Sequence, residues 1–96
     1  MRKDGIEMRA VITVIGKDMV GILARVSSRC AEHGINVLEV TQSILQDMFA
    51  MIMMVDLTGS DLPFTDFADE LAAIGGEMGL SIHAMHEDIF NTMHHV

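Results

Sequence analysis

The chain has 96 residues, half of them apolar, which fits one small domain with a hydrophobic core. Six basic residues stand against 14 acidic ones, and the formal net charge is −8. This charge argues against nucleic acids and anionic membranes as direct partners, because both are themselves negatively charged.

The single cysteine, Cys30, excludes an internal disulfide and is typical of a reducing compartment. The N-terminal stretch MRKDGIEMR contains no apolar signal core. The longest apolar run, at residues 49–55, is far shorter than the roughly 20 residues of a membrane span. We therefore expect a cytoplasmic protein.

The first two predicted elements are a strand and a helix. Residues 8–15 (MRAVITVI) are mostly β-branched and end at Gly16, which predicts a strand. Residues 19–33 carry apolar side chains at three- and four-residue steps, which predicts an amphipathic helix. Asp18 is its expected N-cap, and Gly34 occupies the position where a left-handed residue ends a helix. The expected buried stripe consists of Ile22, Leu23, Val26 and Cys30.

Two strands and a tight connection follow. Residues 36–45 alternate between apolar and polar side chains, which predicts a half-buried strand. Gln46 and Asp47 fit a short hairpin connection. Residues 49–57 are apolar on both faces, as is typical of a central strand that is covered on both sides.

The last predicted elements are a helix and a strand. Pro63 fits the first helical turn, with a cap at residues 61–62, and the glycine pair 75–76 should weaken the helix end. Residues 80–87 alternate as a fourth strand. In the predicted helix that follows Pro63, the acidic residues expected on the solvated face are Asp66, Asp69 and Glu70.

The predicted order of strand, helix, strand, strand, helix and strand is the ferredoxin-like βαββαβ arrangement of the α+β class. It places two helices on one face of a four-stranded antiparallel sheet and leaves the other face bare. The apolar second face of residues 49–57 therefore needs a partner or the tail, and a homodimer is the favoured explanation. We divide the chain into an N-terminal segment (1–7), a domain (8–87) and a C-terminal tail (88–96).

Residues 12–42 (ITVIGKDMVGILARVSSRCAEHGINVLEVTQ) resemble the first half of an ACT domain. ACT domains show a strand, a D-x-x-G-[IVL] turn, a helix, a glycine and an asparagine that opens the next strand. The matching residues here are Asp18, Gly21, Ile22, Gly34 and Asn36, with Val20 in place of the usual proline. The sequence is similar to small stand-alone ACT proteins and to the ACT segments of glycine-cleavage regulators and formyltetrahydrofolate deformylases.

The resemblance implies a regulatory module that binds a small amino acid between two ACT units, without a cofactor and without enzymatic activity. Gly16 replaces a polar residue of many ligand-binding members, which weakens side-chain recognition. Asp18 either caps the helix or binds the ligand's ammonium group. Carried over position by position, the expected ligand-binding residues are Gly16, Lys17, Asp18, Met19, Val20, Gly21, Ile22, Asn36 and Val37.

Other functions have less support in the residues. A protein-interaction module without a small-molecule ligand, contacting a regulated partner through its Met-rich face, is the alternative. His83 and His86 are three apart on a predicted strand and should point to opposite faces, so they form no metal pair. Cys30 should be buried and inert. We therefore expect no metal site and no catalytic residue.

Overall fold

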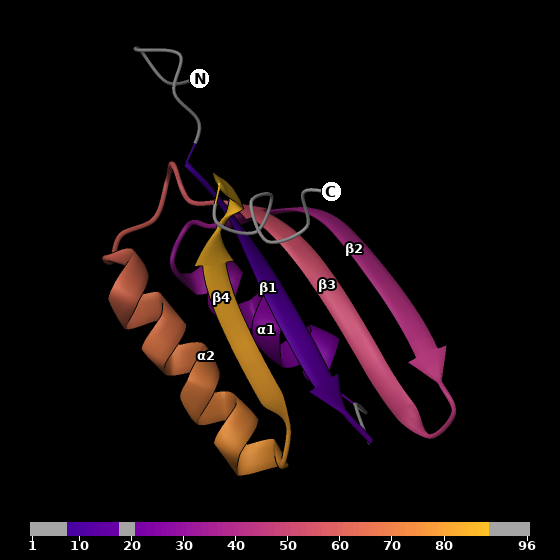
Figure 1. The fold of residues 1–96 in the computed structure, drawn as a ribbon. Helices are drawn as coiled ribbons and strands as arrows, with labels where there is room; N and C mark the ends of the chain where they lie inside the picture. The colour runs from indigo at the N-terminus through magenta and orange to yellow at the C-terminus, as the bar shows by residue number, and fades with distance from the viewer. Residues whose placement is uncertain (1–7, 18–20, 89–96) are drawn as a thin grey trace.

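Strands and helices follow one another as β1 (Arg9–Gly16), α1 (Ile22–Glu32), β2 (Asn36–Leu45), β3 (Met48–Asp56), α2 (Phe64–Met78) and β4 (Ser81–His86). The computed structural model describes residues 8–17 and 21–88. The strands form one antiparallel sheet in the order β2-β3-β1-β4, and in the view of Figure 1 α1 lies behind the sheet and α2 lies beside β4. The predicted βαββαβ fold is confirmed, with β3 in a central position.

The core lies between the sheet and the helices and follows from the alternation of β1 and β3. Antiparallel pairing sets Ile12 opposite Met53 and Val14 opposite Met51, and all four side chains are buried. Each such side chain contributes about 1.5–3 kcal/mol through removal from water. The helices complete the same cluster with Ile22, Val26 and Cys30 from α1 and Phe67, Leu71 and Ile74 from α2.

The N-terminal end of α1 differs from the sequence prediction, and its C-terminal end agrees with it. The helix begins at Ile22 rather than at residue 19, and Leu23, expected in the buried stripe, is 38% exposed. At the other end Gly34 is left-handed, with a φ of 73°, as predicted. Its N–H donates to the carbonyl of Ala31, and the N–H of Ile35 donates to that of Cys30, which is the Schellman arrangement.

Helix α2 is longer than predicted at its C-terminal end. Pro63 is its N-cap rather than part of its first turn, and the helix continues through Gly75 and Gly76 to end at the left-handed Gly79. The reason is packing against β4, because a Cβ on Gly75 would lie 2.8 Å from the carbonyl oxygen of Leu80. Gly75 therefore allows close contact between α2 and β4 and does not mark a helix end.

The adjacent glycines of α2 should respond to alanine with opposite signs. Gly76→Ala should raise the free energy of unfolding by about 0.5–1 kcal/mol, because alanine restricts the unfolded chain and has open space around it. Gly75→Ala should lower it, because the backbone of Leu80 cannot move aside without opening the helix–sheet contact. Urea denaturation of both variants measures this, and a stabilised Gly75→Ala would contradict the packing role.

Candidate functional site

The predicted ligand-binding turn leaves the sheet at the end of β1. Gly16 is the last residue of β1, and Lys17 follows as an exposed bend residue whose Nζ lies 3.7 Å from Oδ2 of Asp47. Asp18, Met19 and Val20 lie outside the described residues. Gly21 then precedes α1, whose first residue, Ile22, is buried in the core. The turn thus connects the core directly to the N-terminus of a helix.

The two glycines of the turn have different physical roles. A Cβ on Gly16 would lie 2.1 Å from Cδ2 of Leu80, so Gly16 makes room for a core side chain that directly precedes β4. Gly21 has a φ of 80°, and no other described residue lies within 4 Å of where a Cβ would stand. A side chain at Gly21 would be strained by the backbone rather than by a neighbour. Gly21 alone therefore leaves room for a ligand to approach the backbone.

The N-terminus of α1 carries no side-chain cap among the described residues. The N-cap is Gly21, and no acidic residue stands in the first helical turn. The prediction that Asp18 is the N-cap is therefore wrong, because the helix starts three residues later than such a cap requires. The first hydrogen bond of the helix runs from the N–H of Arg25 to the carbonyl of Gly21. The preceding N–H groups and the helix dipole together favour an anion such as a carboxylate.

Asn36 and Val37 lie at the opposite end of the sheet from the turn. Asn36 pairs with Asp56, which pairs with Arg9 at the start of β1, whereas Gly16 pairs with Phe49 at the far end of β3. Seven residue steps along β1 separate these ends, or about 23 Å at the usual strand rise. One chain therefore does not bring Asn36 and the turn together.

Strand β2 is the least covered element of the sheet. Each of its residues from Asn36 to Ile44 is exposed, including the apolar Val37, Leu38, Val40 and Ile44. A bulge at residue 38 shifts the register with β3, so that Val40 and Ile44 face the side of the sheet that carries the helices. The helices nevertheless leave this edge uncovered.

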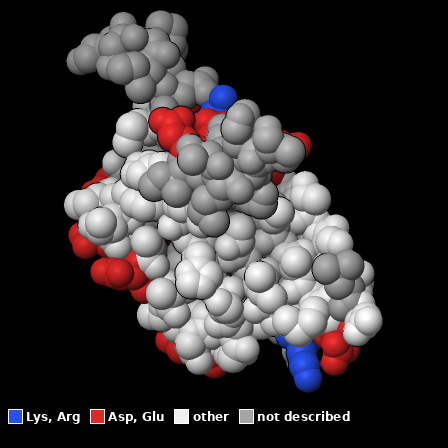
Figure 2. Space-filling view, in the orientation of Figure 1, with Lys and Arg blue, Asp and Glu red and all other residues white. Residues whose placement is uncertain are grey.

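The face of the sheet opposite the helices is bare only in part. Val11 on this face is fully buried, while Ile15 and Ile52 remain 45% and 39% exposed. Figure 2 shows few charged side chains across the visible part of this face, with acidic residues gathered at its margins.

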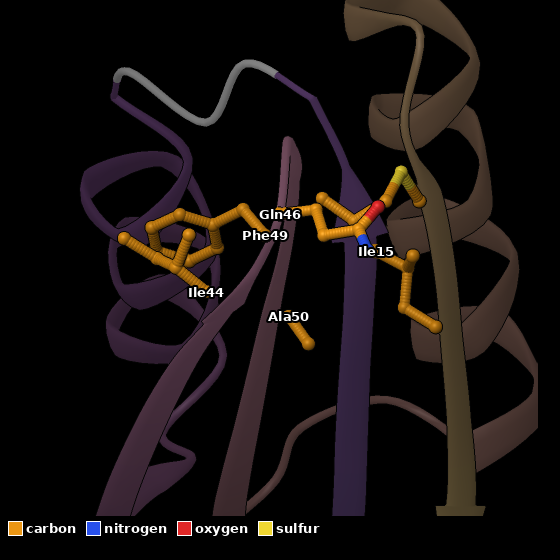
Figure 3. A pocket seen from close by; sticks show the side chains of 6 residues that line it. Ile15, Ile44, Gln46, Phe49 and Ala50 are labelled. Atoms are coloured by element: carbon orange, nitrogen blue, oxygen red, sulfur yellow. The ribbon is translucent and has the colours of Figure 1, made fainter.

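A pocket of about 540 Å³ opens beside the β2–β3 hairpin, and we call it the hairpin pocket. Figure 3 shows Gln46 of the connecting turn near Ile15 at the end of β1. Gln46 has a φ of 57°, a left-handed conformation that is uncommon outside glycine, asparagine and aspartate. The pocket is lined by Ile15, Ile44, Gln46, Met48, Phe49 and Ala50. Sequence reasoning missed it, although a two-residue hairpin without glycine or asparagine was an available signal.

An ion-pair network joins the C-terminal end of α1 to α2. Glu70 accepts hydrogen bonds from Arg29 Nη2 at 2.7 Å and Nε at 3.2 Å, and lies 3.2 Å from Nε2 of His33. Nδ1 of His33 lies 2.9 Å from Oδ1 of Asp61. The expectation of a solvated Glu70 is therefore wrong, whereas Asp66 and Asp69 are exposed as expected.

The network shifts the pKa values of its members in opposite directions. Hydrogen bonding to Asp61, followed by contact with Glu70, raises the pKa of His33 above its ordinary value of 6.5. Hydrogen bonding to Arg29 is the main cause that lowers the pKa of Glu70. These groups tie two helices together on the surface of the domain, away from the turn, and belong to its stability.

The groups considered for catalysis and metal binding lie apart from one another. Cys30 is buried in the core, and burial raises the pKa of its thiol to about 11, so it is protonated at neutral pH. His83 pairs with Thr13 and His86 with Ala10, so the two rings point to opposite faces, as predicted. Across residues 8–17 and 21–88, no three His, Cys, Asp or Glu side chains are arranged to hold a metal ion.

The described part of the chain contains no helix long and apolar enough to cross a membrane.

The family model of the ACT domain matches residues 8–85 of the chain. The chain belongs to the ACT domain family. Two relatives are UPF0237 proteins. The one from Clostridium acetobutylicum is 49% identical over 93% of this chain and 100% of its own length. The one from Methanopyrus kandleri is 44% identical over 92% of this chain and 98% of its own length.

Solved structures agree with this assignment. An ACT domain protein from Streptococcus pneumoniae superposes with a TM-score of 0.75 at 35% identity, covering 88% of this chain and 96% of that one. A putative glycine cleavage system transcriptional repressor gives 0.70 at 22% identity, over 85% of this chain and 47% of that protein. A formyltetrahydrofolate deformylase from Pseudomonas syringae superposes with a TM-score of 0.71 at 19% identity, covering 88% of this chain and 28% of that protein. The last two show likeness of fold, and the resemblance to ACT domains is confirmed.

The His33 network should make the stability of this ACT domain depend on pH. Because the folded pKa of His33 is raised, its stabilising contribution is complete below pH 6.5 and is lost as the pH rises through that raised value. His33→Gln should therefore flatten the decline of the urea midpoint above pH 6.5. His83→Gln is the matched control, since its exposed ring contacts Ser81 alone among the hydrogen bonds of the described residues. Equal pH profiles for His33→Gln and the wild type would contradict the network's role.

Proposed function

We propose that this chain is a cytoplasmic regulatory module that binds a small amino acid between two copies of itself and catalyses no reaction. The observation that carries the proposal is the N-terminus of α1, where no side chain of residues 8–17 or 21–88 caps the helix and none lies near Gly21, in a chain of the ACT family. The turn formed by residues 16–22 occupies the position where the family resemblance places the ligand.

The chemistry of the proposed site suits a zwitterion. The free N–H groups at the start of α1 would bind the ligand's carboxylate. The N-cap of α1 is Gly21. In this proposal Asp18 binds the ligand's ammonium group, and Asn36 can donate to and accept from the ligand.

A second copy of the chain would complete the site through β2. Natural edge strands are protected by charges, prolines or a covering element. Strand β2 has ten residues with one charged side chain, Glu39, and no proline, and it is exposed. Antiparallel pairing of two β2 edges sets the start of one strand beside the end of the other. Asn36 of the partner subunit would thereby lie near the turn of the first chain, whereas the first chain's own Asn36 is far from that turn.

A second function is favoured by the same exposed strand. Apolar side chains on an uncovered edge also suit a different protein as partner, and a module of that kind would need no amino acid. The ligand and oligomer measurements below separate the two functions.

Amino-acid binding should raise the thermal midpoint in a concentration-dependent way, because a ligand that binds only the folded state stabilises it. The measurement is a thermal-shift screen of the 20 amino acids, followed by calorimetry. Asp18→Ala and Asn36→Ala should remove the shift and keep the fold. A flat response to every amino acid at millimolar concentration would refute the sensor and favour the interaction module.

Dimerisation should depend on the edge of β2 rather than on the open face of the sheet. Val40→Lys places two like charges near the twofold axis and should weaken the dimer by roughly a hundredfold. Ile52→Lys is the control, because Ile52 is similarly exposed, 39% against 36%, but lies on central β3. Sedimentation equilibrium should give a monomer only for Val40→Lys. Loss of the dimer in Ile52→Lys alone would instead place the interface on the open face.

A further inference from the structure

We propose that residues 89–96 of this chain dock on the open face of the sheet, opposite the helices, over the end that carries Val11, Met54 and Met85. We call these three residues the Val11 row. Residues 89–96 lie outside the described residues, whereas every residue of the Val11 row is described. The inference goes beyond the proposed function, and it differs from the sequence-based expectation that a second copy covers this face.

The Val11 row is the covered end of a face that is exposed elsewhere. The register sets Met54 of β3 and Met85 of β4 on either side of Val11, on the same face of the sheet. Val11 is fully buried, and both methionines are half-buried. Ile15 faces the same way four residues farther along β1, about 13 Å away, and is 45% exposed. A cover therefore lies over the Val11 row and stops short of the other end of the face.

The described side chains at this end supply only part of the cover. Nη1 of Arg9 donates to Sδ of Met54 at 3.6 Å, and Nε of Arg9 lies 3.3 Å from Oε1 of Glu87. The side chains of Arg9 and Glu87 are themselves only 34% and 26% exposed, although they stand at the end of the sheet. The cover therefore extends over this ion pair as well as over Val11.

The cover belongs to the same chain, because Val11 is buried within a single copy. Residues 1–7 and 89–96 both adjoin this end of the sheet, since β1 starts here and His86 of β4 pairs with Ala10. Residues 1–7 (MRKDGIE) carry four charged side chains. Residues 89–96 (IFNTMHHV) carry no Asp, Glu, Lys or Arg, although these make up 21% of the whole chain. The C-terminal segment is therefore the better match for an apolar surface.

The length and the side chains of residues 89–96 suit the Val11 row. The row spans three neighbouring strands, which places β4 and β3 about 10 Å apart. Eight residues reach about 12 Å as a helix and about 26 Å when extended, so either conformation is long enough to cross the row. Ile89, Phe90 and Met93 would gain free energy by leaving water against this surface.

A second copy of the chain fits the open face less well. It would cover the whole face, including Ile15 and Ile52, rather than one end. It would also bring together the acidic margins of two chains that each carry a formal net charge of −8 (Figure 2). Docking of residues 89–96 shields the apolar end of this face within one chain and leaves the edge of β2 as the surface for association.

The first test compares two truncations of the full chain. Removal of residues 89–96 should lower the thermal midpoint by at least about 4–8 °C and should increase binding of the apolar dye anilinonaphthalene sulfonate, because the Val11 row loses its cover. Removal of residues 94–96 alone is the matched control, since it keeps the apolar side chains and should leave both readouts nearly unchanged. All chains are compared at one protein concentration, because dimerisation also shifts the midpoint.

A double-mutant cycle tests the position of the contact. Phe90→Ala should lower the thermal midpoint, and it should lower it by less than about half as much in a Met85→Ala background, because the effects of residues in contact do not add. The full shift should persist in an Ile15→Ala background, because Ile15 lies at the other end of the same face. These point variants also serve if the truncated chain does not fold.

Four outcomes would overturn the proposal. An unchanged midpoint and unchanged dye binding without residues 89–96 would show that they do not cover the face. Equal shifts for Phe90→Ala in the Met85→Ala and Ile15→Ala backgrounds would remove the Val11 row as the docking position. Loss of the cover on removal of residues 1–7 alone would assign the face to the N-terminal segment. Dye binding that rises when the full chain is diluted would assign it to a second copy.

Discussion

The antiparallel pairing of β1 with β3 is the constraint on which the rest of the domain depends. It aligns the buried side chains of the two central strands, from Ala10 opposite Val55 to Val14 opposite Met51. Because β2 is also antiparallel to β3, β1 and β2 run in the same direction. The end of β1 and the start of β2 therefore lie at opposite ends of the sheet, and this separates the turn at Gly16 from Asn36.

That separation determines how the proposed sensor works. A ligand that meets both the turn and an Asn36 side chain needs two chains, and the uncovered β2 supplies an edge at which two chains can pair. Binding would then be coupled to dimerisation, because a ligand that contacts both subunits stabilises the pair over the separated chains. Ligand binding would thereby raise the population of the dimer, and any protein that distinguishes the dimer from the monomer would respond to that change. This coupling is the physical basis of regulation by such a module.

The sequence predicted the features that depend on local periodicity. The bounds of β2 are those predicted, and the faces of β1 and β4 follow the alternation of their residues. Local patterns failed where contacts from distant residues decide the outcome. Gly75 resembles a helix end but allows close packing against Leu80, and Glu70 resembles a solvated residue but is bonded to Arg29 and His33.

The candidate site was predictable in part for the same reason. The D-x-x-G turn is a local motif, and the structure makes its Gly21 the N-cap of α1. The hairpin pocket is lined by residues at the ends of three strands, and no local sequence pattern predicts that these ends come together. Only the structure distinguishes the roles of the two glycines. Gly16 packs against Leu80, whereas no other described residue lies within 4 Å of a Cβ at Gly21.

The central claim is that one amino-acid site is built from two chains, and subunit complementation tests it most directly. Asp18→Ala and Asn36→Ala chains, co-expressed with different tags and purified as the mixed dimer, carry one turn with Asp18 and an intact Asn36 on the other chain. The account predicts that each variant alone fails to bind the amino acid in calorimetry and that the mixed dimer regains binding. A mixed dimer that binds no better than either variant alone would contradict it.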